Sequence, residues 1–304
     1  MLSINTNTAS MAAVNAINKS NASLSTSMER LATGNRINSS ADDAAGKQIA
    51  SRLKSQSDGM TVALRNIQDA TAMLQTADSM FDEMTDVLGR MKDLATQAAN
   101  GTYSTDDLQA MQDEYDELGQ QMSDMLENTT YGGTNLFGNA SNSNTSTAGL
   151  FTGSVQFQVG AEASDTMTVD ISTQLSGLTD ALSSLSTSFG DDWDNTTPTA
   201  SGSAGSELMT ASGATDTITA VQGAMDDVAA IQSKLGASIN RLTDTAANLT
   251  SMQDNTEVAI GNIMDTDYAT EASNMTKQQV LMQTGITMLK QSNSMSSMVS
   301  SLLQ

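Results

Sequence analysis

Cysteine and histidine are absent from this chain of 304 residues, and proline occurs once. Without cysteine the chain can form neither a disulfide nor a thiolate metal site, and without histidine it lacks the commonest general base and metal ligand. A single proline permits very long helices. Aromatic residues make up only 3% of the sequence, while methionine occurs 21 times. We therefore expect thin helical hairpins and bundles, no enzyme activity, no cofactor and no metal site.

The negative charge of the chain is concentrated in its middle. The formal net charge is −22, but residues 1–40 carry +2 and residues 264–304 carry −1, which leaves −23 for the middle. An acidic middle stays solvated and repels nucleic acid and anionic membranes. No apolar run approaches the ~20 residues of a membrane span, and the first residues lack the pattern of a secretory signal. We expect no nucleic-acid partner and no membrane insertion, in a protein that is either cytoplasmic or exported without a cleaved signal.

Both ends of the chain carry apolar residues at alternating steps of three and four. Near the C-terminus only the small Gly285 and Ser292 dilute this pattern. Such heptads are typical of a helix that packs against a partner, so we predict that the two terminal helices pair and form the functional part of the protein. The predicted assembly core consists of Val14, Ile17, Leu24, Met28, Leu31, Leu281, Met288, Met295, Val299 and Leu302.

The middle of the chain predicts three more helices. Residues 49–98 hold about seven unbroken heptads, a strong indication of a coiled coil. Residues 105–127 continue the three-four spacing and are expected to fold back as an antiparallel hairpin. The spacing returns over residues 218–263, whose length matches that of residues 49–98, so we expect these two helices to pair. The heptads stop after Ile263, and residues 265–278 are mostly polar, which predicts a joint facing a second joint at residues 34–40.

The remaining segments predict loops and one β-hairpin. Residues 128–153 have a loop composition, whereas Val155–Val159 and Met167–Ile171 alternate with the period of two typical of strands. Residues 173–213, which hold Trp193 and Pro198, are predicted to be an exposed insertion with a short helix near 175–187. The fold class is therefore mainly α, a long antiparallel coiled-coil rod with paired terminal helices, a β-hairpin and a small variable insertion. The predicted domains are 1–40 with 264–304, 41–172 with 214–263, and 173–213.

Several motifs in a fixed order carry a family resemblance. The segment Leu24–Ser39, followed by Asp42–Gly46, resembles the N-terminal signature of bacterial flagellins. Further agreement comes from three blocks, at Ala98–Thr102, at Phe157–Ala161, and at Leu235–Ala237 with Asn240–Leu242. The resemblance covers about residues 1–172 and 214–304, and it leaves only the insertion without a counterpart.

The resemblance implies a function. Flagellins are secreted through a type III apparatus and assemble into the extracellular filament that drives motility. Their terminal helices build the inner tube and the coiled-coil domain builds the outer tube. Their partners include an export chaperone, the filament cap, hook-junction proteins and an innate immune receptor. The residues that match the family's receptor patch are Arg90, Leu94 and Glu114, and the same positions serve packing and ion pairing between subunits.

Other classes of protein fit the sequence less well. The main alternative is a flagellin-like protein at the hook–filament junction. A membrane-active translocator would need Lys or Arg along the polar faces of its helices, and the C-terminal helix has only Lys277 and Lys290. Asp191, Asp192, Asp194 and Asn195 lack the glycine turn and distal glutamate of a calcium loop, so we interpret them as a solvated loop.

Overall fold

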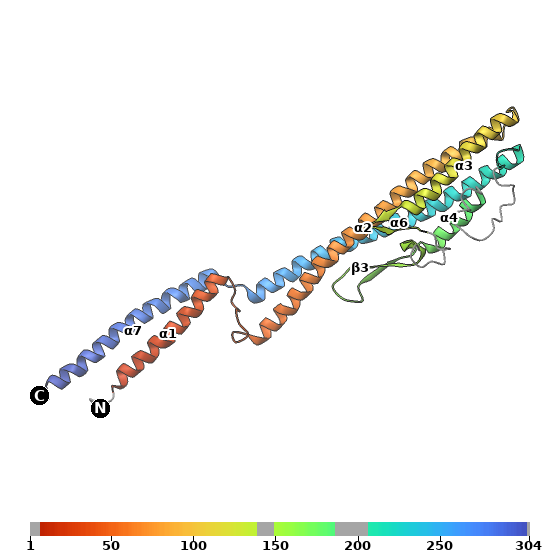
Figure 1. Cartoon of the computed structure of the whole chain (residues 1–304). Coiled ribbons are helices and arrows are strands. Elements are labelled where there is room, and N and C mark those ends of the chain that lie inside the picture. Colours follow the sequence, from red (N-terminus) through yellow and green to blue (C-terminus); the bar gives the residue numbers. More distant parts are fainter. Residues whose placement is uncertain (1–6, 139–148, 186–205, 303–304) are drawn as a thin grey trace. The chain divides into compact units, whose positions relative to one another are not determined.

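The structure is a computed structural model that describes residues 7–138, 149–185 and 206–302, and the described chain is mainly helical (Figure 1). The long helices that the heptads predict are present, with α2 and α6 each starting several residues earlier than expected. The α-helices are α1 (Thr8–Thr33), α2 (Ala44–Ala98), α3 (Thr105–Asn128), α4 (Ser172–Leu185), α6 (Ala211–Met264) and α7 (Tyr268–Leu302). The remaining elements are β1 (Thr130–Tyr131), β2 (Thr134–Asn135), the 3-10 turn η1 (Leu150–Thr152), β3 (Val155–Gln158) and β4 (Thr166–Val169).

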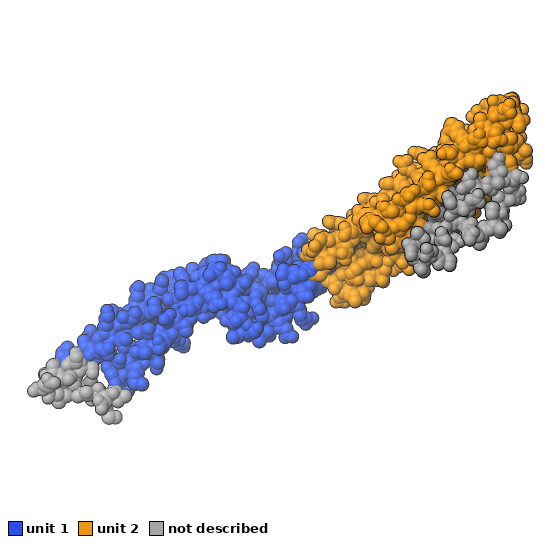
Figure 2. Space-filling view, in the orientation of Figure 1, with its two compact units in different colours: residues 1–58, 252–304 blue, residues 59–251 orange. Residues whose placement is uncertain are grey.

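The chain forms two compact units, which are coloured separately in Figure 2. Unit 1 consists of residues 1–58 and 252–304, and unit 2 of residues 59–251. The three-domain division predicted from the sequence stays a prediction. The predicted acidic loop at 191–195, Trp193 and Pro198 all lie outside the described residues.

The core of unit 2 contains the two heptad rows of α2. Along each row the side chains recur every seven residues and are buried, so burial follows the sequence pattern. The companion row is rich in alanine, whose small side chain permits a close approach of neighbouring helices. The first row is Met60, Ile67, Leu74, Phe81, Leu88 and Ala95, and the second is Ala63, Ala70, Ala77, Met84, Met91 and Ala98.

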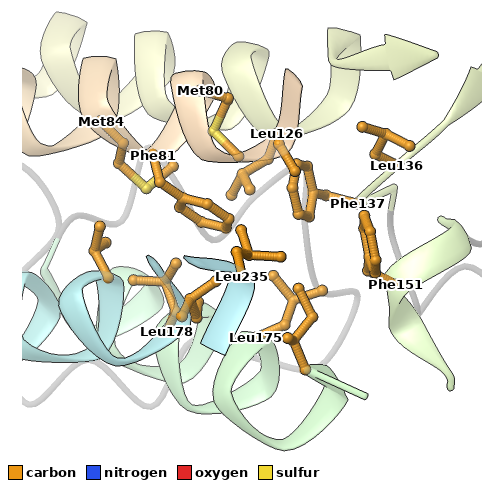
Figure 3. Close-up of a cluster of buried hydrophobic side chains, with 14 of the residues drawn as sticks. Met80, Phe81, Met84, Leu126, Leu136, Phe137, Phe151, Leu175, Leu178 and Leu235 are labelled. Atoms are coloured by element: carbon orange, nitrogen blue, oxygen red, sulfur yellow. The ribbon is translucent and has the colours of Figure 1, made fainter. Parts of the chain in front are cut away.

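Side chains from α2, α3, α4 and α6 meet three phenylalanines in this core (Figure 3). The ring centroids of Phe81 and Phe137 are 5.1 Å apart in an edge-to-face arrangement, and those of Phe137 and Phe151 are 5.7 Å apart and stacked. Both geometries are favourable for aromatic pairs. Phe137 and Phe151 come from the stretch 128–153 that the sequence predicts to be loop.

The loop prediction for residues 128–153 is wrong in two places. Strands β1 and β2 pair through a turn at Gly132 and Gly133, whose φ angles of 60° and 83° are both positive. A two-residue hairpin turn of this hand favours glycine at both positions, so the Gly-Gly pair was the missed signal. The turn η1 follows at 150–152 and places Phe151 in the core. The predicted hairpin of β3 and β4 is confirmed, with Val155 opposite Val169 and Phe157 opposite Met167.

Helix α3 holds both borders of the segment 186–205. The buried Tyr115 hydroxyl donates to the carbonyl of Leu185 at 3.2 Å. The buried Gln112 side chain accepts from the Leu208 backbone N–H at 2.8 Å, and its amide donates to Asp116 at 2.9 Å and to Glu207 at 2.7 Å. Helix α3 therefore forms hydrogen bonds with the described residues on both sides of this segment.

Candidate assembly surface

Unit 1 contains the two terminal helices and the joint that connects them to α2 and α6. At the joint, the backbone N–H of Arg36 donates to the carbonyl of Met264 at 2.6 Å, and that of Thr266 donates to Gly34 at 2.9 Å. The Arg36 guanidinium adds a hydrogen bond to the carbonyl of Ile263 at 2.7 Å. The two predicted joints do face one another, but the break in the helical chain covers only residues 265–267. The polar stretch from 268 onward is already helix α7.

Local signals in the sequence fix the ends of these helices. The Asn7 side chain caps α1 by accepting from the Ser10 N–H at 3.2 Å, and Gly34 ends it with a φ of 76°. The Asp43 side chain accepts from the Gly46 N–H at 2.9 Å at the start of α2. A Cβ at Gly46 would lie 2.8 Å from Ile37 Cδ1, so the turn packs around a glycine.

Helices α1 and α7 pack side by side and run antiparallel (Figure 1). At one end, Asn7 donates to Ser292 at 3.0 Å, and Ser10 donates to Asn293 at 3.3 Å. At the other end, the Tyr268 hydroxyl donates to the carbonyl of Leu31 at 3.3 Å. These contacts confirm the predicted pairing of the terminal helices.

An ion pair near the joint also joins the two terminal helices. Arg30 Nη1 lies 3.8 Å from Glu271 Oε2, and Glu271 is the buried partner. A carboxylate that loses its cation inside a packed interface is left unpaired, which is more costly than the loss of an exposed pair. The pair therefore ties the start of α7 to the end of α1.

The faces that α1 and α7 turn toward each other combine large and small side chains. On α1 the inner row is Ile17, Leu24 and Leu31, and each of them is at least partly buried. The half-buried positions of α7 have the spacing of a second inner face, and they include glycine, serine and alanine. These α7 positions are Ala272, Met275, Gln278, Met282, Gly285, Leu289 and Ser292.

Five of the ten residues of the predicted assembly core point away from the partner helix, and their role in assembly stays a prediction. Ile17, Leu24 and Leu31 do lie on the inner face, as do Gly285 and Ser292. The outward residues are between 41% and 62% exposed, and they form a row on each helix. The α1 row is Val14 and Met28, and the α7 row is Leu281, Met288 and Met295. Helix α7 reaches Leu302, but the side chains of Val299 and Leu302 are outside the described set.

Other exposed apolar side chains lie on the same two helices as these outward residues. Val280, Ile286 and Met298 on α7 and Met11 on α1 are also exposed. Scattered apolar residues are normal on protein surfaces, whereas a concentration of them marks an interaction site. We call the outward residues Val14, Met28, Leu281, Met288 and Met295 the outward rows.

The second candidate site lies in unit 2, where Arg90 of α2 meets Glu114 of α3. The Arg90 side chain pairs with Glu114, and both side chains remain about half exposed. Leu94 is buried in the core. The structure thus brings the charged pair to the surface, whereas the leucine is part of the core.

The described residues show no group of acidic side chains arranged to hold a metal ion. Over the same residues, no helix is long and apolar enough to cross a membrane. What the described chain does present is an antiparallel pair of helices with apolar rows on the outside. This arrangement defines the class as a helical structural protein with surfaces that suit association.

Family models identify the chain. Residues 4–142 match the bacterial flagellin N-terminal helical region, and residues 218–303 match the C-terminal helical region. The chain belongs to the bacterial flagellins, which are structural subunits of the flagellar filament and not enzymes.

Curated relatives extend over the whole chain. Flagellin A of Vibrio anguillarum is 30% identical, and the alignment covers 100% of both chains. Polar flagellin C of Vibrio parahaemolyticus is 29% identical, again over 100% of both. A solved structure from Vibrio parahaemolyticus, named for association with the flagellar hook, is 14% identical with a TM-score of 0.52. It covers 74% of this chain and 100% of its own, and it supports the mainly α fold alone.

Proposed function

We propose that this flagellin polymerises into the extracellular flagellar filament used for motility, and that neighbouring copies bury the outward rows. The observation that carries the proposal is the exposure of Val14, Met28, Leu281, Met288 and Met295 on a helix pair. Burying a side chain of this size contributes about 1.5–3 kcal/mol, which offsets the entropy lost when the ends of the chain become ordered. Repeated head-to-tail contacts of this kind generate open helical arrays.

The two units take different places in the proposed filament. Helices α1 and α7, whose segments are nearly neutral, form the inner tube, where many copies pack densely. The helices of unit 2 belong to the strongly acidic middle of the chain and form the outer tube, where charge can stay solvated. The contrast between nearly neutral terminal segments and an acidic middle supports this assignment of inner and outer tubes.

Export and partners complete the proposal. The chain leaves the cell through a type III apparatus, and a chaperone covers the apolar ends before assembly. The filament cap and hook-junction proteins then contact the growing polymer. The exposed Arg90–Glu114 pair is the proposed contact for the innate immune receptor, with Leu94 supporting it from the core. A junction role for the chain itself is less well supported, because the curated relatives over its whole length are flagellins.

Two substitutions on α7 test the proposal. Met288→Glu places a charge in an outward row, whereas Gln291→Glu adds the same charge at an exposed polar position of the same helix. We expect Met288→Glu to prevent filament formation in ammonium sulfate and Gln291→Glu to assemble like the parent protein. Deletion of residues 281–304 is expected to leave a soluble, folded protein that cannot polymerise. Filaments formed by the truncated protein would refute the role of the outward rows.

A further inference from the structure

Gly285 marks a very close approach between the terminal helices. A Cβ atom built on Gly285 would lie 2.8 Å from Cγ1 of Ile17 and 3.5 Å from its Cδ1. Carbon atoms in favourable contact are about 3.5–4.0 Å apart. The two helices can therefore pack in this way only because residue 285 lacks a side chain, and the Ile17 side chain fills the space that is left.

The helical glycines of the described chain differ in their surroundings, and at Gly46, Gly59, Gly213 and Gly261 a Cβ would also lie within 3 Å of another residue. Gly89, Gly177, Gly223 and Gly236 each have open space where a Cβ would stand. Glycine weakens a helix interior, because it has more conformational freedom to lose than any other residue. At position 285 the lower helix stability is explained by packing, because the Ile17 side chain occupies the space beside the backbone of α7.

The fit distinguishes the observed register from registers shifted by one heptad. Seven residues from Gly285 along α7 lie Gln278 and Ser292, both of which carry side chains. A shift in one direction would place Ile17 opposite Gln278. A shift in the other direction would place it opposite the side chain of Ser292 and would bring Leu24, which is not branched at Cβ, opposite Gly285. Only the observed register places the branched Ile17 side chain opposite the glycine.

We propose that the Ile17–Gly285 contact sets the register of α1 against α7 and thereby aligns the outward rows for assembly. Val14 lies three residues before Ile17, and Met288 lies three residues after Gly285. Because the helices are antiparallel, Val14 and Met288 stand at the same level along the pair. A neighbouring copy therefore meets the two rows at fixed relative heights. This role of Gly285 as a positioning residue rests on the proposed function of the outward rows.

Disulfide trapping in the full-length chain tests the register, since the chain has no cysteine of its own. The reporter carries Ser10→Cys and Asn293→Cys, at two side chains that meet at 3.3 Å in the observed register. The effective concentration of the two thiols is measured in a glutathione buffer, in soluble protein and in filaments. Non-reducing gels separate disulfides within one chain from those between copies.

We expect Gly285→Ala to lower the effective concentration of the reporter thiols at least tenfold, and the additional change Ile17→Ala to restore it to within about twofold of the parent. Gly223→Ala is the matched control, because this exposed helical glycine has open space around it, and it should leave the value unchanged. An unchanged value in Gly285→Ala, or no recovery with Ile17→Ala, would overturn the proposal. So would a parent protein that forms no disulfide within one chain in either state.

The same proteins separate this inference from the proposed function. If the parent chain failed to form filaments, the proposed function would fail, while trapping in soluble protein would still decide the register. If the parent formed filaments and Gly285→Ala left trapping unchanged, only the role of Gly285 would fail.

Discussion

The guanidinium of Arg90 donates two hydrogen bonds to one carboxylate oxygen of Glu114, from Nε at 2.8 Å and from Nη2 at 2.6 Å. The pair joins α2 to α3 across the surface of unit 2, where water and salt screen it. Four residues further along α2, Leu94 is buried beneath this surface. Arg90 and Leu94, four residues apart on α2, therefore contribute differently: Arg90 forms a surface ion pair, and Leu94 is part of the core.

The surface ion pair is expected to contribute little to stability. Glu114→Gln removes the charge while keeping a similar shape, and exposed pairs are typically worth about 0.2–1 kcal/mol. We expect the thermal midpoint to fall by no more than about 2–4 °C and the difference to vanish in high salt. Thermal unfolding followed by circular dichroism at low and at high salt measures the midpoint and the effect of salt on it. A loss that persisted unchanged in high salt would show that the pair acts by packing and not by charge.

Leu94 is expected to matter far more for folding than the ion pair above it. Leu94→Ala leaves a cavity in the unit 2 core, which typically costs about 2–5 kcal/mol. Val62→Ala, at an exposed position on the same helix, should cost less than about 0.5 kcal/mol. Urea unfolding of the two variants measures the difference. Equal losses would mean that Leu94 is not part of the stabilising core.

Gln112 is predicted to fix the start of α6 to α3. Gln112→Leu keeps the volume but leaves the buried Leu208 N–H without its acceptor, a cost of about 1–3 kcal/mol. Gln109→Leu is the control, since that side chain is exposed and bonds only to Asp113 in its own helix. We expect faster hydrogen exchange at the Leu208 amide in Gln112→Leu alone. Equal protection in both variants would argue against the anchoring role.

Asp116 is expected to make unit 2 more stable in mild acid. Burial raises the pKa of Asp116, the hydrogen bond from Gln112 opposes the shift, and the charges of Glu207 and Asp113 raise the pKa further. The folded state therefore keeps its proton at a pH where the unfolded chain has lost it. The stability from this site is fully present below the ordinary pKa of the carboxyl and is lost as the pH rises through the raised value.

Asp116→Asn removes this dependence on pH. Because the side chain is partly exposed and screened, we expect the variant to gain only a few tenths of a kcal/mol at neutral pH. The ratio of variant to parent unfolding constants, measured in urea across pH 4 to 7, isolates the site from other carboxylates. A variant that lost stability at neutral pH relative to the parent would contradict the assignment.

The long helices could be predicted because burial in unit 2 follows the heptads. Every apolar position from Met60 to Ala95 in the first row of α2 is buried, so spacing alone sufficed there. The small hairpin at Thr130–Asn135 was missed because two-residue strands are too short to show a period, and only the Gly132-Gly133 turn indicates them.

The terminal helices show where heptad spacing fails. The largest apolar residues, including Met288 and Met295, were expected to face the partner helix. The structure instead packs the row that contains Ile17 against an α7 face that includes Met282 and Leu289. The glycine at 285 on this face permits a close approach of the two helices. Spacing cannot distinguish a row that packs within one chain from a row that packs between copies, since both are apolar and seven residues apart.

The most direct measurement is electron microscopy of the purified full-length protein before and after addition of ammonium sulfate, with circular dichroism alongside. Burial of the outward rows predicts long uniform filaments together with a rise in helicity as the terminal helices become ordered. Protein that remains monomeric under these conditions, with unchanged helicity, would contradict self-assembly and would favour a junction protein that needs another protein as template.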